Sequence, residues 1–216
     1  MTTLTSSSTT SSIRPWVHTA GAWCLAAGLV GVAQAALLLV WPKQVSVDRF
    51  SYPFTSAGFV VAQATFALQH VPLAIGVAAL GGLPAVRASR TARIGVIGAV
   101  VGLALLALLE VIAMSAYGVA EHSSRGNLIE NAYAVPVLLV GFGLTLAGIA
   151  LLRRGRSAWA GVGWMPWLVL ALGVYVYFPL SPAISGSFTA GRLGIGGWML
   201  LYTALGYGLM RVRDDH

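Results

Sequence analysis

The sequence predicts an all-α integral membrane protein with six transmembrane helices arranged as three hairpins and both termini in the cytoplasm. Composition is the first reason: 57% of the 216 residues are hydrophobic, only 9% are charged, and the mean hydropathy is +0.81. An average soluble domain carries roughly 25% charged residues. The other reasons are six apolar runs of membrane-spanning length and an uneven distribution of Lys and Arg between the loops.

Each apolar run is long enough, at about 1.5 Å per residue, to cross a hydrocarbon core about 30 Å thick. We place the spans near residues 16–41, 58–83, 93–118, 132–152, 159–179 and 193–210. The Ser/Thr-rich tail 1–13 has no apolar face to bury, so we expect it to be disordered. Residues 14–213 then form a single transmembrane domain, and residues 214–216 form a short C-terminal tail.

The basic residues divide into two sets when the chain is threaded through these spans. One set lies at the termini and in the second and fourth gaps: Arg14, Arg87, Arg90, Arg93, Arg153, Arg154, Arg156, Arg211 and Arg213. The other gaps hold Lys43, Arg49, Arg125 and Arg192. Because Lys and Arg concentrate in short cytoplasmic loops, the richer set is predicted to face the cytoplasm.

The same charges indicate the surroundings of the protein. The net charge of +7 lies almost entirely in short loops, so we expect the lipid bilayer as partner, with anionic head groups at the cytoplasmic arginines, and no nucleic acid. Twelve Arg against one Lys, with abundant Ala, Gly and Val, is typical of a high-GC bacterial gene. We therefore expect a multi-pass protein of a bacterial plasma (inner) membrane.

The first span has an alternative interpretation. Arg14, the apolar stretch after it and the triplet Ala33-Gln34-Ala35 resemble a signal peptide with a cleavage site after Ala35, which would leave five helices. The apolar run continues without a break to Trp41, which favours an uncleaved spanning helix.

Small and aromatic residues describe how such helices would pack. Gly98 with Gly102, and Ala27 with Gly31 and Ala35, place small residues one turn apart, which permits close helix contacts in lipid. Aromatic residues expected near the membrane interfaces are Trp16, Trp41, Tyr52, Tyr133, Trp159 and Trp164.

Glu110 is the strongest chemical signal, because a charged side chain at a bilayer centre costs roughly 2.5 to 3.5 kcal/mol and commonly marks function. Counted from the cytoplasmic side near Ile94, it lies about 24 Å across the bilayer, in the outer half. Gln34 and Gln63 are predicted at a similar depth. His70 lies seven residues after Gln63, on the same helix face and nearer the midplane.

These residues predict a polar pocket among the first three spans, binding through Glu110, Gln34, Gln63, His70 and Tyr117. Tyr117 extends the face of Glu110, and with His122 and Arg125 it would cover the outer mouth. Gln69 is expected to point elsewhere. A structural alternative stays open, in which the Gln and His side chains only hydrogen-bond neighbouring helices and Glu110 is a neutral, hydrogen-bonded carboxyl.

Motifs of several enzyme classes are absent. The sequence contains no HExxH, GxSxG or GxxxxGK[ST] motif, and its single cysteine, Cys24, excludes an internal disulfide and a CxxC zinc site. The four histidines do not pair at matching depth as haem ligands would. We expect no catalytic residues, no metal and no cofactor.

Three functions remain open. The leading hypothesis is a small permease-like or ligand-binding protein, in which Glu110 binds a proton, a cation or a cationic solute. The second is a non-catalytic accessory or scaffolding subunit of a membrane complex, whose small-residue faces bind the helices of a partner membrane protein. Whether the chain forms a homo-oligomer or binds a partner membrane protein stays open. The third is a lipid-modifying membrane enzyme, with Glu110 as general base and His122 and Arg125 at a head group.

Overall fold

The computed structural model describes residues 14–154, 162–178 and 187–212, and all regular elements in these ranges are helical. The elements in chain order are α1 (Arg14–Val40), α2 (Ser56–Leu80), α3 (Pro84–Arg87), α4 (Arg90–Ala113), the 3₁₀ turn η1 (Met114–Ala116), α5 (Ser124–Leu152), α6 (Met165–Tyr175) and α8 (Phe188–Arg211). Five of them, α1, α2, α4, α5 and α8, are long and apolar enough to cross a membrane. The prediction of an all-α protein with several membrane-spanning helices is confirmed to this extent.

The fifth predicted span, 159–179, is represented by the shorter helix α6. Its 11 residues rise about 16 Å, roughly half of a hydrocarbon core. Pro166 occupies the first turn, where its missing N–H leaves no helical hydrogen bond unmade, and this favours a helix start there. Hydropathy alone measures the apolar run and does not detect this start. Residues 159–161 and 179 of the predicted span lie outside the described residues.

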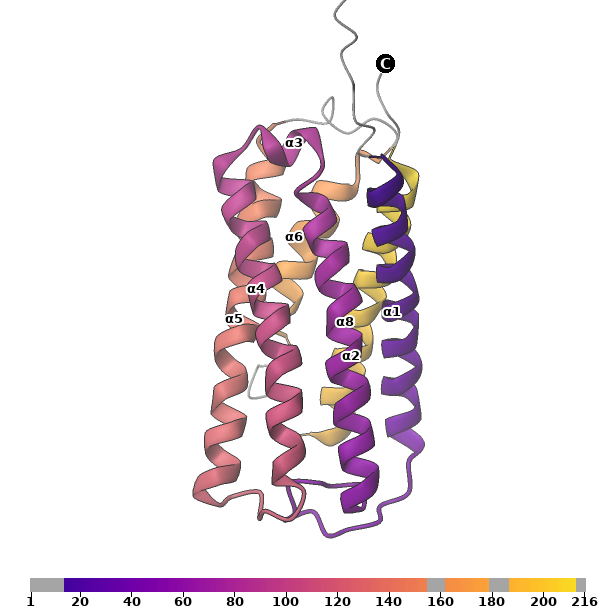
Figure 1. The fold of residues 1–216 in the computed structure, drawn as a ribbon, viewed down its shortest axis with the longest axis vertical. Coiled ribbons are helices and arrows are strands. Elements are labelled where there is room, and N and C mark those ends of the chain that lie inside the picture. Colours follow the sequence, from indigo (N-terminus) through magenta and orange to yellow (C-terminus); the bar gives the residue numbers. More distant parts are fainter. Residues whose placement is uncertain (1–13, 155–161, 179–186, 213–216) are drawn as a thin grey trace, which may run out of the picture.

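The long helices pack as a bundle in which sequence neighbours are mostly spatial neighbours (Figure 1). α2 packs between α1 and α4, and α5 packs between α4 and α6. α1 also packs along α8, so the first and last helices close the bundle. The start of α1, the short α3 and the end of α8 lie at one end, which we call the terminal end, and the connections 41–55 and 114–123 lie at the opposite loop end.

Small residues bring the α4 and α5 backbones together. A Cβ added to Gly95 would meet the Gly143 carbonyl and lie 2.8 Å from the Ala147 backbone nitrogen. Two turns further along α4 toward the loop end, a Cβ on Gly102 would lie 2.7 Å from the Pro136 carbonyl oxygen. These small-residue faces are therefore used for packing inside the chain.

The two connections at the loop end are tied to each other. The Phe50 N–H donates to the Val119 carbonyl (3.1 Å), and the Glu121 N–H donates to the Asp48 carbonyl (2.8 Å). The Arg49 guanidinium adds a hydrogen bond to the Gly118 carbonyl (3.1 Å). These bonds hold the 41–55 connection, with its aromatic side chains, across the base of the bundle.

Two further expectations concern the N-terminal region and the tails. α1 continues without a break through Ala35, whose side chain is buried. The tails, residues 1–13 and 214–216, lie outside the described residues.

A candidate ligand cavity

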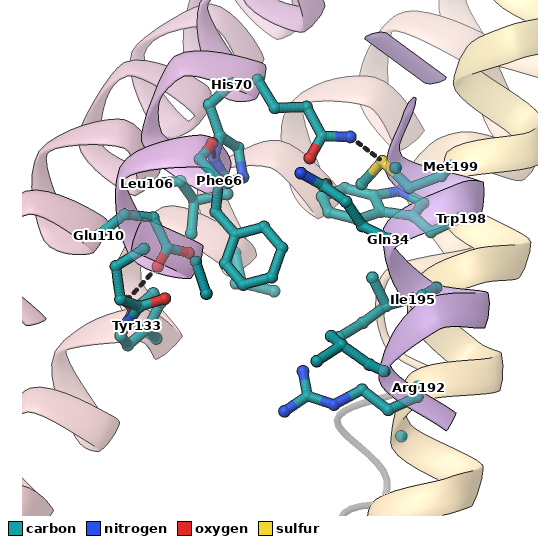
Figure 2. A pocket seen from close by; sticks show the side chains of 18 of the residues that line it. Gln34, Phe66, His70, Leu106, Glu110, Tyr133, Arg192, Ile195, Trp198 and Met199 are labelled. Carbon is teal, nitrogen blue, oxygen red and sulfur yellow. Dashed lines mark hydrogen bonds between the residues drawn. The ribbon is translucent and has the colours of Figure 1, made fainter. Parts of the chain in front are cut away.

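A cavity of about 460 Å³ lies inside the bundle. α1, α2, α4, α5 and α8 all contribute side chains to it, together with the 41–55 connection. Its size lies within the range of roughly 300–1,000 Å³ that is usual for small-molecule sites. Figure 2 shows polar groups from different helices turned toward its interior.

Glu110 lines this cavity from the last turns of α4, and its side chain is buried. The Tyr133 hydroxyl, from α5, donates a hydrogen bond to Glu110 Oε2 (2.9 Å). The Gln63 side chain, from α2, lies next to the same hydroxyl. A carboxyl group, a phenol and an amide from three helices therefore meet at one wall.

His70 lies further along α2, on the same cavity wall as Gln63. Its Nδ1 is 2.7 Å from the Phe66 carbonyl oxygen, which can only accept, so Nδ1 carries a proton. In the neutral imidazole Nε2 is then a hydrogen-bond acceptor. The ring thus presents an acceptor to the cavity.

Two glutamines occupy the end of the cavity where α1, α2 and α8 meet. Gln69 Nε2 donates to the Ala27 carbonyl (2.9 Å) and contacts Met199 Sδ (3.4 Å), while the Gln34 side-chain oxygen is buried without a hydrogen-bond partner. A Cβ at Gly31 would overlap the Gln69 amide, so this glycine makes room for it. Gln69, expected to point elsewhere, lines the cavity with Gln34 because the cavity spans more than one face of α2.

Arg192 enters the cavity from the first turns of α8 and faces the side where Glu110 and Tyr133 lie (Figure 2). Its guanidinium carbon lies 4.8 Å above the centre of the Phe188 ring. Phe188 in turn makes an edge-on contact with Tyr52 of the 41–55 connection, with ring centres 5.4 Å apart. Cation–π contact with a supported ring orients the Arg192 side chain.

The remaining walls are apolar or aromatic. Phe66, Leu106 and Ile195 lie between the polar groups and are labelled in Figure 2. Trp198 lines the cavity with its ring, while its indole N–H donates outward to the Leu172 carbonyl (3.3 Å). The cavity therefore combines a few convergent polar groups with an apolar lining, as ligand sites commonly do.

The structure brings together four of the seven site residues predicted from the sequence. Glu110, Gln34, Gln63 and His70 all line the cavity. The three predicted mouth residues, Tyr117, His122 and Arg125, are exposed and are not among its lining. Arg125 instead donates a hydrogen bond to the Ser115 hydroxyl (2.8 Å).

The position of Tyr117 has a physical cause. Its predicted face extrapolates α4 beyond residue 113, but the helix ends there and the chain continues through η1. A 3₁₀ turn has 3.0 residues per turn in place of 3.6, so the side-chain phase changes. Tyr117 is consequently 48% exposed at the loop end.

Two residues of the cavity, Tyr133 and Arg192, were not predicted as site residues. Tyr133 appeared only as an interfacial aromatic and Arg192 only as a loop charge. In the structure, Tyr133 lies in α5, one turn before Pro136, and Arg192 lies in the second turn of α8. Two signals were available: the polar, capped start Ser123–Gly126 of α5 and Ser187, whose side chain accepts from the Ala190 N–H and starts α8.

In residues 14–154, 162–178 and 187–212, no group of three or more His, Cys, Asp or Glu side chains is placed to hold a metal ion. Cys24 is buried between α1 and α8, with its thiol directed at the Tyr202 carbonyl (3.5 Å).

The fold and the site together define a class: a helical protein with several membrane-spanning helices around an internal, mixed polar and aromatic cavity. Comparisons with protein-family models, with curated proteins and with solved structures gave no match to this chain.

Proposed function

We propose that this protein is a permease-like, ligand-binding membrane protein whose binding site is the cavity around Glu110. Glu110, Gln63 and His70 bind the polar part of a small solute, or a proton or cation that accompanies it. The aromatic and aliphatic walls bind the apolar part. The single observation that carries this proposal is the convergence of polar side chains from four helices on one cavity of about 460 Å³: Gln34 and Tyr133, which are half-buried, and Gln63, His70 and Glu110, which are buried.

The burial of polar groups at the cavity carries an energetic cost. Burying a polar group without a partner costs roughly 1–3 kcal/mol in proteins, so such groups normally pair with each other. Glu110 is buried and makes one described hydrogen bond, at Oε2, so its second oxygen has no described partner. A bound solute that donates a hydrogen bond would remove this cost, whereas a purely structural joint leaves it in place.

We further propose that the cavity opens toward the outside of a bacterial plasma membrane. Aromatic residues of the 41–55 connection line it, and this connection lies at the loop end (Figure 1). The arginine-rich α3 region, the start of α1 and the end of α8 lie at the terminal end. The distribution of positive charge supports a cytoplasmic terminal end, and therefore an outward loop end.

The two alternative functions have weaker support. The small-residue faces at Gly31 and Gly102, which a partner's helices would use, already pack against α8 and α5. The head-group residues of the enzyme hypothesis, His122 and Arg125, are exposed outside the cavity lining.

Small molecules that co-purify with the full chain test the proposal. Mass spectrometry would compare wild type with Ala62→Phe, which places a ring in the cavity, and with Val61→Phe on the exposed side of the same helix. We expect a small molecule to accompany wild type and Val61→Phe and to be lost from Ala62→Phe. Recovery of the same molecules from all three proteins, or of none from wild type, would contradict the proposal.

A further inference from the structure

The lining of the cavity contains one acidic and one basic side chain. Glu110 is the one acidic residue and Arg192 the one Lys or Arg among the described lining residues. They come from α4 and α8, which are not sequence neighbours and face each other across the cavity (Figure 2). The site is thus formally balanced in charge, with the charges separated in space.

The two charges act on each other without pairing directly. Each lies within electrostatic range of the other, but no ion pair within 4.0 Å joins them among the described residues. Glu110 is held by the Tyr133 hydroxyl and Arg192 by the Phe188 ring. Each group is therefore oriented by its own neighbour and retains hydrogen-bonding capacity toward the space between them.

The acceptors that lack a described partner lie away from Arg192. Glu110 accepts one described hydrogen bond, at Oε2, so Oε1 has no described partner, and Nε2 of the neutral His70 ring is an acceptor because Nδ1 donates to the Phe66 carbonyl. Both side chains lie above Arg192 in Figure 2. One part of the cavity therefore offers acceptors, and the other offers the five N–H donors of a guanidinium.

An ammonium group matches the first part and a carboxylate the second. An ammonium has three donors and no acceptor, and a guanidinium presents a planar fork that fits a carboxylate. A ligand with one charge would leave the opposite protein charge buried and unpaired, which is unfavourable at low dielectric. A ligand with both charges pairs both residues.

Resting on the function proposed above, we propose that the cavity selects a net-neutral amino acid-like zwitterion with an apolar side chain. Its carboxylate pairs with Arg192, and its ammonium lies beside Glu110 and His70. Its apolar part packs against Phe66 and the Trp198 ring, which supply aromatic wall between the charged groups.

Three probes that share a phenyl ring and a short chain isolate the charge: phenylalanine (zwitterion), phenethylamine (cation) and 3-phenylpropanoate (anion). Their affinities would be measured by titration calorimetry on the full chain in lipid nanodiscs. For wild type we expect phenylalanine to bind at least about tenfold more tightly than either other probe, the scale of one charged contact. Failure of phenylalanine to bind, or equal affinities for the three probes, would overturn the inference.

Charge variants give opposite expectations. Glu110→Gln leaves Arg192 uncompensated, so 3-phenylpropanoate should become the preferred probe. Arg192→Gln leaves Glu110 uncompensated, so phenethylamine should become the preferred probe. If both variants keep the wild-type order of affinities for the three probes, the inference is overturned. The inference also fails if the affinities do not depend on the charge of the probe. If Ala62→Phe abolishes that binding, the proposed function still stands.

Phe188→Leu provides a variant that keeps both charges. Phe188 is not among the cavity-lining residues, but its ring supports the Arg192 guanidinium. We expect phenylalanine and 3-phenylpropanoate to bind about threefold more weakly, with phenethylamine unchanged. A uniform loss for all three probes would indicate a merely structural effect and contradict the role of Arg192.

Discussion

Glu110 makes one hydrogen bond, between α4 and α5, and faces the cavity. Its partner is the Tyr133 hydroxyl, which a carboxyl can accept from whether it is charged or neutral. Arg192, the basic residue of the cavity lining, belongs to a helix on the far side of the cavity. A carboxyl that is hydrogen-bonded at one oxygen and faces a cavity can exchange a proton or bind a ligand without unfolding the helix.

Replacing Tyr133 by Phe tests this arrangement at one atom. Tyr133→Phe removes the 2.9 Å hydrogen bond and leaves the ring, so we expect a loss of about 1 kcal/mol in the free energy of unfolding. The carboxyl vibration of Glu110, identified by its absence in Glu110→Gln, should shift in infrared difference spectra. Tyr117→Phe is the matched control, since Tyr117 is 48% exposed, and an identical spectrum for Tyr133→Phe and wild type would contradict the assignment.

At the scale of elements, a residue's position could be predicted where it depends on the spacing within one helix, and could not where it depends on helix ends or on packing against other helices. Gln63 and His70 share a helix with a regular phase, so their common face could be predicted from spacing alone. Tyr117 could not, because its phase depends on where α4 ends and η1 begins. Arg192 could not be assigned to the cavity because the rotation of α8 is set by its packing against α1.

The length of α6 illustrates the same limit. Hydropathy predicts an apolar run over 159–179, but where a helix starts and stops depends on local signals such as Pro166 and on tertiary contacts. The five long helices were predictable because composition and length determine them almost entirely.

Two glycines of α4 separate packing from intrinsic helix preference. Gly95→Ala places a methyl group against the α5 backbone, so we expect a loss of about 1–3 kcal/mol in the free energy of unfolding. Gly98→Ala has its nearest contact at 4.0 Å and should be neutral or stabilising by about 0.5–1 kcal/mol. Thermal unfolding in detergent compares them; equal stabilities would show that α4 and α5 do not approach closely at Gly95.

On the scale of the whole molecule, the arginine-rich α3 region, the start of α1 and the end of α8 gather at one end of the bundle, and the cavity lies toward the other. This polarity connects the orientation of the protein in the membrane with the side from which a solute would reach the cavity. The orientation is a prediction from loop charge.

Cysteine labelling in cells measures that orientation directly. Cys24 is fully buried, so the wild-type chain should not react with a membrane-impermeant maleimide. His122→Cys, at the loop end, should be labelled in intact cells, whereas Arg90→Cys, at the terminal end, should be labelled only after permeabilisation. The reverse pattern would place the cavity toward the cytoplasm.

Modification of a cysteine at position 34 measures whether solutes reach the polar residues of the cavity. We expect a small charged methanethiosulfonate to modify Gln34→Cys and phenylalanine to slow this reaction. Leu37→Cys, on the exposed side of the same helix, should not react from within lipid. An unreactive Gln34→Cys in folded protein, or a rate equal to that of Leu37→Cys, would contradict the account.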